Sequence, residues 1–133
     1  MSPLLPLLAA RGARAQTTPL PSQTLVYDGI PVKQNGRNRS RAGFKGVAHS
    51  GCEIEVHQTE LAPGEAPHPP HRHLHDEVIL IRDGTLEVTI DGRKTTLGPG
   101  SIVYAASNVE HGWRNAGATP ANYFVIALGR DTA

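Results

Sequence analysis

The sequence predicts an all-β protein, built as a sandwich or barrel of short strands. The first observation is that short segments alternate apolar and polar residues, with turn residues between them at regular intervals. The second is composition: Gly occurs 14 times and Pro 11 times in 133 residues, which suits many strands joined by tight turns better than a helical bundle. The third is that no segment shows a convincing helical period.

Seven segments are expected to form strands: 52–57, 77–82, 85–90, 93–97, 101–104, 110–115 and 122–128. The alternation is cleanest in 85–90, where Leu86, Val88 and Ile90 share one face. Asp83-Gly84 and Asp91-Gly92 are predicted hairpin turns, because both residue types tolerate positive φ. Gly98-Pro99-Gly100 marks another turn, and the prolines between residues 61 and 70 mark a loop.

One barrel domain is expected over residues 23–133, preceded by a distinct segment over residues 1–22. That segment holds a short apolar run, Leu4–Ala10, and Ala13-Arg14-Ala15, which resembles a signal cleavage site. It is interpreted either as a signal for export to the periplasm or as an N-terminal arm of a cytoplasmic protein. Prolines at 19 and 21 predict an extended linker. Residues 24–27 are a candidate strand for pairing with a neighbouring subunit.

Charge and hydropathy exclude several classes of protein. The formal net charge of +1 and the absence of aromatic residues interleaved between Lys33, Arg37, Arg39 and Arg41 argue against a nucleic-acid partner. No apolar run is long enough to span a membrane. The basic stretch from Lys33 to Lys45 is interpreted as a solvated loop, with a cationic flap for an anionic substrate as the alternative. Cys52 is the single cysteine, so no intrachain disulfide can form, and its face shared with Ile54 and Val56 predicts a buried structural thiol.

Candidate metal ligands concentrate between residues 68 and 77, where four of the seven histidines lie. His71, His73 and Glu77 have the same parity as Ile79 and Ile81, so one strand running through all five would place them on one face. If that face lines the barrel interior, two imidazoles and a carboxylate converge in an apolar cavity, a composition typical of metal sites. His111, on the next strand that bears a histidine, is the candidate fourth ligand.

These residues match two motifs, and through them the chain resembles the small single-domain bacterial cupins. The first motif appears as His71-Arg72-His73, three residues, Glu77, six residues and Gly84, with Gly64 as the leading glycine. The second appears as Gly100, five residues, Ala106-Ser107-Asn108, two residues, His111, three residues and Asn115. Ala106 replaces the usual proline and Asn108 the usual glycine. Asn is the residue best able to replace Gly at positive φ, so the turn is expected to persist.

The resemblance implies a cupin-type jelly-roll β-barrel, or double-stranded β-helix, that binds one divalent metal ion through His71, His73, Glu77 and His111. An imidazole and carboxylate shell suits Fe, Mn, Zn, Ni or Cu and does not choose among them. Four protein ligands on a six-coordinate ion leave two positions for a small-molecule substrate or O₂. The resemblance also implies a homodimer, while charge and hydropathy predict no nucleic-acid or membrane partner.

Three functions follow as hypotheses. The first is a metal-dependent enzyme, dioxygenase-like before decarboxylase, isomerase or lyase; the second is a non-catalytic cupin that binds or senses a small molecule; the third is a metal-free structural cupin. No catalytic acid or base is assigned beyond the metal centre.

The other conspicuous side chains have simpler interpretations. His68 and His75 are expected at the rim of the site or the surface, with indirect support of the ligands as the alternative, and His49 and His57 at the surface. Trp113 is expected in the core or as a pocket wall. Tyr104 and Arg114 are expected to be packing or surface residues rather than substrate contacts, and Asn115 a structural turn residue.

Overall fold

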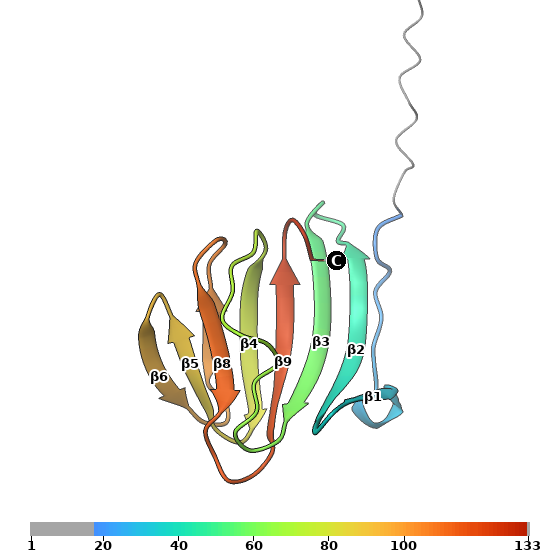
Figure 1. The fold of residues 1–133 in the computed structure, drawn as a ribbon. Helices are drawn as coiled ribbons and strands as arrows, with labels where there is room; N and C mark the ends of the chain where they lie inside the picture. Colours follow the sequence, from blue (N-terminus) through green and yellow to red (C-terminus); the bar gives the residue numbers. More distant parts are fainter. Residues whose placement is uncertain (1–17, 133) are drawn as a thin grey trace, which may run out of the picture.

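Two antiparallel sheets, of six and three strands, form the part of the chain that the computed structural model describes, residues 18–132 (Figure 1). The six-stranded sheet has the order β1-β2-β3-β9-β4-β7, and the three-stranded sheet the order β6-β5-β8. The strand bounds are β1 Val32–Asn35, β2 Asn38–Val47, β3 Glu53–Leu61, β4 Asp76–Asp83, β5 Leu86–Ile90, β6 Arg93–Leu97, β7 Ile102–Ala105, β8 His111–Asn115 and β9 Ala121–Leu128. The predicted all-β fold is confirmed, and the described residues hold no helix of the length and hydropathy that crossing a membrane requires.

The core lies between the two sheets. Alternate residues of each strand point inward, so β4 and β9 contribute Ile79, Tyr123 and Val125 from one side. From the other side β5 contributes Leu86 and Val88. This packing of two inner faces holds the strands that carry the histidines in fixed positions.

The predicted Asp91-Gly92 hairpin is confirmed. Ile90 pairs with Arg93, and the two turn residues have φ of 48° and 78°. Positive φ at both central residues gives the strand twist that a two-residue hairpin needs, which explains why Asp and Gly occur here.

The predicted hairpin at Asp83-Gly84 is wrong, because the strands on either side of it belong to different sheets. β4 pairs with β7 and β9, whereas β5 pairs with β6 and β8. Gly84 has φ 82°, and a Cβ there would lie 2.6 Å from the Cα of Ala121. The glycine therefore lets the chain cross closely from one sheet to the other.

The basic stretch from Lys33 to Lys45 is not a loop, as was expected, but forms most of the β1-β2 hairpin. All four residues of β1 are exposed, and Arg39 in β2 pairs with Glu60 in β3. Charged residues are common on edge strands because they discourage further pairing, and this makes such a strand resemble a loop in composition.

The segment before β1 is not the expected strand over residues 24–27. It runs without strand pairing to a single 3₁₀ turn, η1 (Tyr27–Gly29), and lies along the outer face of the six-stranded sheet. Tyr27 accepts hydrogen bonds from Arg41 (3.0 Å) and Asn122 (2.8 Å), which hold the segment to β2 and β9. The predicted signal or arm over residues 1–15 lies outside the described residues.

Candidate metal centre

The loop between β3 and β4, residues 62–75, brings the first two candidate ligands to the opening between the sheets. His71 and His111 form an isolated antiparallel bridge, with both backbone N–H···O=C distances 3.0 Å. The predicted strand from His71 through Ile81 is therefore wrong, since β4 begins only at Asp76. Pro69 and Pro70 cannot donate to a ladder, so the chain pairs with β8 for one residue and then turns toward β4.

All four predicted ligands nevertheless meet. His71, His73, Glu77 and His111 each offer one ligand atom, and these atoms lie within 4.8 Å of one another. The Glu77 side chain comes from the six-stranded sheet and His111 from the three-stranded sheet, while the loop supplies the other two. Such a group of His and Glu side chains could hold one metal ion.

Backbone carbonyls orient two of the three imidazoles. His73 Nδ1 lies 2.8 Å from the carbonyl oxygen of His75, and His111 Nδ1 lies 2.8 Å from that of Val109. A carbonyl only accepts, so each Nδ1 carries the proton and each Nε2 faces Glu77. Metal-binding histidines are commonly held in this way.

Glu77 is the centre of the cluster. Its Oε1 contacts Nε2 of His73 and lies 3.2 Å from Nε2 of His111. Burial alone would raise the pKa of Glu77, but the hydrogen bonds and charge of the two histidines lower this pKa to about 2. The hydrogen bond to Glu77 in turn raises the pKa of His111. A carboxylate oxygen and two Nε2 atoms facing one another need a shared cation, either a proton or a metal ion.

His71 completes the fit of the group to a metal ion. Its Nε2 is buried and makes no hydrogen bond to any described residue. Burial and then the imidazoles of His68, His73 and His111 lower its pKa to about 4, so the ring is neutral at pH 7. A neutral imidazole with a buried free lone pair is the form of histidine that binds metals.

A cavity of about 260 Å³ is lined by three of the four residues, His71, His73 and Glu77. Its wall includes Trp113 and Tyr123, both buried, together with Glu55 and His57 of β3. Placing His57 at the surface was wrong: its Nδ1 lies 2.7 Å from Oε1 of Glu55, and the pair faces the cavity. Strand parity carried the missed signal, because His57 shares its face with the fully buried Leu61.

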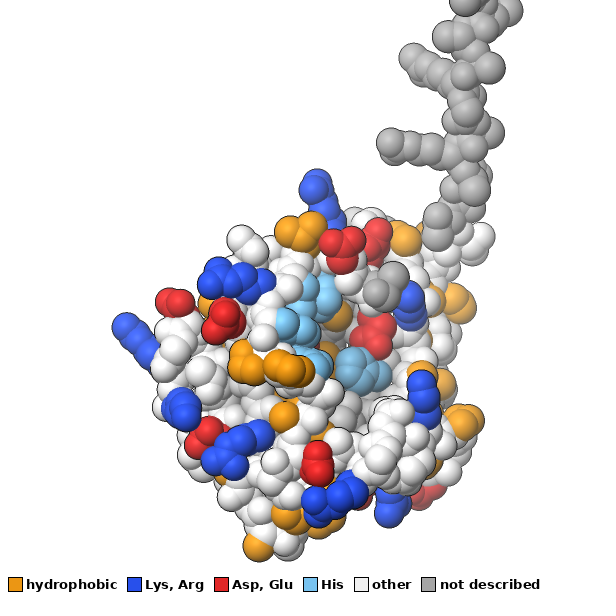
Figure 2. Space-filling model, in the orientation of Figure 1, with side chains coloured by type: hydrophobic (Ala, Val, Ile, Leu, Met, Phe, Trp, Pro, Cys, Tyr) orange, Lys and Arg blue, Asp and Glu red, His pale blue; other side chains and the backbone are white. Residues whose placement is uncertain are grey.

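The two flanking histidines lie in the same cavity rather than at the surface. His68 stacks on His71 with ring centroids 3.9 Å apart, and His75 stacks on His73 at 3.6 Å. His75 Nε2 is also 3.6 Å from Oε1 of Glu77. The alternative, indirect support of the ligands, fits these contacts. Figure 2 shows the resulting gathering of histidine side chains on one face.

The remaining interpretations hold with one change. Asn115 is fully buried and structural, since its side-chain amide donates to the carbonyl oxygens of Leu61 and Thr119. Trp113 is both core and cavity wall, while Arg114 is exposed and pairs with Glu87. The other residues divide by exposure: Cys52 is only partly buried, whereas His49 and Tyr104 are exposed, and Tyr104 donates a hydrogen bond to Asp76.

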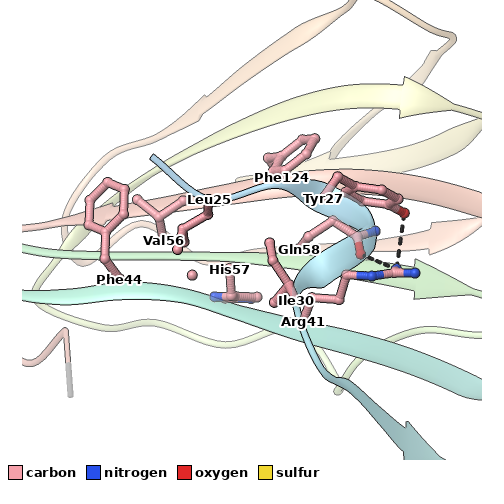
Figure 3. A pocket seen from close by; sticks show the side chains of 10 residues that line it. Leu25, Tyr27, Ile30, Arg41, Phe44, Val56, His57, Gln58 and Phe124 are labelled. Atoms are coloured by element: carbon pink, nitrogen blue, oxygen red, sulfur yellow. Dashed lines mark hydrogen bonds between the residues drawn. The ribbon is translucent and has the colours of Figure 1, made fainter. Parts of the chain in front are cut away.

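A second cavity, of about 240 Å³, lies on the outer face of the six-stranded sheet beneath the N-terminal segment (Figure 3). Its walls are mainly apolar, with Leu25, Phe44 and Phe124 among them. Arg41 lies at one end, where its hydrogen bonds go to Tyr27 and Gln58. None of the four clustered residues lines this cavity.

Comparisons with known proteins agree with the geometry. L-ectoine synthase of Bordetella petrii is 34% identical to the chain over 71 residues, which are 53% of this chain and 53% of that protein. The chain thus spans about half the length of the curated relative it matches.

Two solved structures share the fold. KdgF from Halomonas sp. superposes with a TM-score of 0.70 at 17% identity, over 84% of this chain and 97% of that one. An RmlC-like cupin from Shewanella frigidimarina superposes with a TM-score of 0.68 at 17% identity, over 84% of this chain and 95% of that one. The model of the Cupin domain family matches residues 57–127, more than half of the chain. The chain therefore belongs to the cupin family.

Proposed function

We propose that this cupin is a metal-dependent enzyme acting on a small organic molecule, with one divalent ion held by His71, His73, Glu77 and His111. The observation that carries the proposal is the convergence of four ligand atoms within 4.8 Å beside a cavity. The ion, when bound, would supply a Lewis acid and a template for substrate or O₂ at the positions that the protein leaves free. Dioxygenase-like chemistry is the leading subtype, with decarboxylase, isomerase and lyase activity behind it.

The chain's own residues prepare the site before any ion binds. Carbonyl oxygens fix the imidazoles of His73 and His111 so that Nε2 faces inward, which reduces the ordering cost of binding. Glu77 is buried between them as a carboxylate and supplies the one negative charge of the ligand set. Trp113 and Tyr123 close the inner end of the cavity against solvent.

Oxygen uptake by the metal-loaded full chain tests the proposal. Catechols, flavonols and diketones are suitable first substrates, and Glu77→Gln should abolish any turnover, whereas His49→Ala, which changes an exposed histidine, should preserve it. Turnover by another reaction, such as decarboxylation, would support a metal-dependent enzyme but contradict the dioxygenase-like subtype. Absence of turnover across all panels, together with ligand-dependent shifts in melting temperature, would instead indicate a binding protein.

We propose that the protein acts as a homodimer. Support comes from large apolar side chains left exposed on the outer face of the six-stranded sheet, Ile102 at 68% and Tyr104 at 59%. They lie on β7, a strand that pairs on one side only among the described strands. Light scattering should give twice the mass of the chain, and Ile102→Glu should shift it to a monomer. A monomeric wild-type protein would contradict the proposal.

A further inference from the structure

Two buried polar groups in the cavity wall make no well-formed hydrogen bond to a described residue: Nε1 of Trp113 and the hydroxyl of Tyr123, which lies near the side chains of Trp113 and Thr59. The side chains of Trp113 and Tyr123 are 6% and 1% exposed, and both line the cavity beside the four clustered residues. An indole N–H can only donate. Leaving such a group buried without a partner destabilises a protein, so native proteins rarely do so without a reason.

The position of these donors connects them to the candidate metal centre. The ring of Trp113 stacks on that of His111, with centroids 5.9 Å apart, and meets the ring of Tyr123 edge-on at 5.8 Å. Burial raises the pKa of Tyr123 far above its ordinary value, so the hydroxyl keeps its proton. A molecule bound at the ion would therefore lie beside two donors and would be held best by oxygen acceptors.

Charge adds a second criterion. A divalent ion with Glu77 as its only carboxylate ligand carries a net charge of +1, because histidines bind metals as neutral imidazoles. Two other carboxylates lie in the cavity wall: Glu55, which is paired with His57 at 2.7 Å, and Asp131 near the C-terminus. The centre therefore favours an anion, and a cavity of about 260 Å³ favours a small one.

We infer that the cavity binds a small carboxylic acid with a second oxygen on the adjacent carbon, such as a 2-oxo or 2-hydroxy acid. One carboxylate oxygen and the neighbouring oxygen would bind the ion where the four protein ligands leave it free. The other carboxylate oxygen accepts hydrogen bonds from Trp113 and Tyr123. This inference rests on the proposed function, because it requires the metal ion, and it adds the substrate class and two residues that select it.

The test uses the full chain loaded with Co(II) and two probes. Oxalate chelates through oxygen and keeps acceptor oxygens free, whereas imidazole binds the ion and offers no oxygen. The absorbance of the bound cobalt measures the binding of both probes. In the wild-type protein, oxalate should also shift the fluorescence of Trp113, the single tryptophan of the chain. Tyr123→Phe should weaken the binding of oxalate about tenfold, as expected for the loss of one hydrogen bond to a charged acceptor. The Kd of imidazole and the Kd of Co(II) should change less than twofold.

Tyr27→Phe is the matched control, because it removes a hydroxyl from a tyrosine that lies outside this cavity and bonds Arg41 and Asn122. It should leave all three Kd values unchanged. Trp113→Phe, followed by cobalt absorbance, should repeat the selective loss of oxalate affinity. Equal oxalate affinity in Tyr123→Phe and wild type, or an equal loss for oxalate and imidazole, would overturn the inference while leaving the metal centre intact. A wild-type protein that binds no Co(II) would overturn the metal centre and this inference together.

Discussion

His71 differs from the other two histidines of the cluster in what its ring contacts. Nε2 of His73 and of His111 faces Glu77, and each ring is held by a carbonyl oxygen. The Nε2 of His71 is buried with no hydrogen bond to a described residue, and its pKa falls to about 4. A protonated His71 would place a second buried charge beside His111, so acid should act first on this residue.

The metal-free protein is therefore expected to lose stability as pH falls from 6.5 to about 4. In this window the unfolded chain binds a proton at His71 and the folded chain does not, since its folded pKa is about 4. The loss from this residue is at most about 3 kcal/mol. Urea unfolding in EDTA should show a shallower fall for His71→Gln, and parallel curves would contradict the assignment.

The other two groups act outside this window or in the opposite direction. The pKa of Glu77 is lowered from 4.5 to about 2, so its contribution is complete above pH 4.5 and is lost as pH falls through about 2. The pKa of His111 is raised, so its contribution is complete below pH 6.5 and is lost as pH rises through the raised value. Comparing the wild-type protein with His71→Gln therefore separates the loss of unfolding free energy at His71 from the contributions of Glu77 and His111.

The side chain of Asn115 joins the end of β3 to the loop between β8 and β9. Its amide donates to the carbonyl oxygens of Leu61 and Thr119, and its side-chain oxygen accepts from the N–H of Gly117 at 2.9 Å. Asn115→Ala leaves these buried groups unpaired and should cost about 2–4 kcal/mol in unfolding free energy. Denaturant melts of Asn35→Ala, at an exposed site, should show almost no change; equal losses in the two variants would contradict this role.

At the scale of elements, the crossing from β4 to β5 depends on Gly84. No side chain fits well at this position, because φ is 82° and an added Cβ would lie 2.6 Å from the Cα of Ala121. Gly84→Ala should therefore destabilise the protein by about 2 kcal/mol or more. Gly98→Ala is the control, because open space surrounds that glycine, and its thermal melt should change little. A loss below about 0.5 kcal/mol for Gly84→Ala would contradict the close approach.

Tyr27 should hold the N-terminal segment to the outer face of the sheet. Its ring lies between the guanidinium groups of Arg41 and Arg82, each 4.2 Å from the ring centroid, and its hydroxyl accepts two hydrogen bonds. Tyr27→Phe keeps the ring and loses both bonds, so amide exchange in residues 20–30 should increase without change in β4 or β9. Faster exchange throughout the sheets would show a general loss of stability instead.

The elements that could be predicted from the sequence are those whose structure depends on local pattern. The predictions were wrong where the structure depends on pairing between segments that are distant in the chain. The alternation in 85–90 and the Asp91-Gly92 turn are local, and both were predicted correctly. Asp83-Gly84 has the same local pattern, but β4 and β5 find partners in different sheets. The charged β1-β2 hairpin has no apolar alternation to mark it, because both faces of β1 are exposed.

The candidate site shows the same division. Spacing and family resemblance selected four residues that the structure brings within 4.8 Å, although the strand expected to carry two of them is a loop. The single-residue bridge between His71 and His111 replaces that strand. The wall residues Glu55, His57 and Tyr123 were missed, because their convergence depends on which face of β3 and β9 turns inward.

At the scale of the whole molecule, two sheets and one loop bring together the four side chains that we propose as ligands of a divalent metal ion. The direct test is elemental analysis by mass spectrometry of untagged protein, before and after reconstitution with Fe(II), Mn(II), Zn(II), Ni(II) or Cu(II). We expect about one ion per chain, at least a tenfold weaker metal affinity in Glu77→Gln and His111→Ala, and no change in His49→Ala. Metal content near zero after every reconstitution, or equal metal affinity in all variants, would contradict the proposed site.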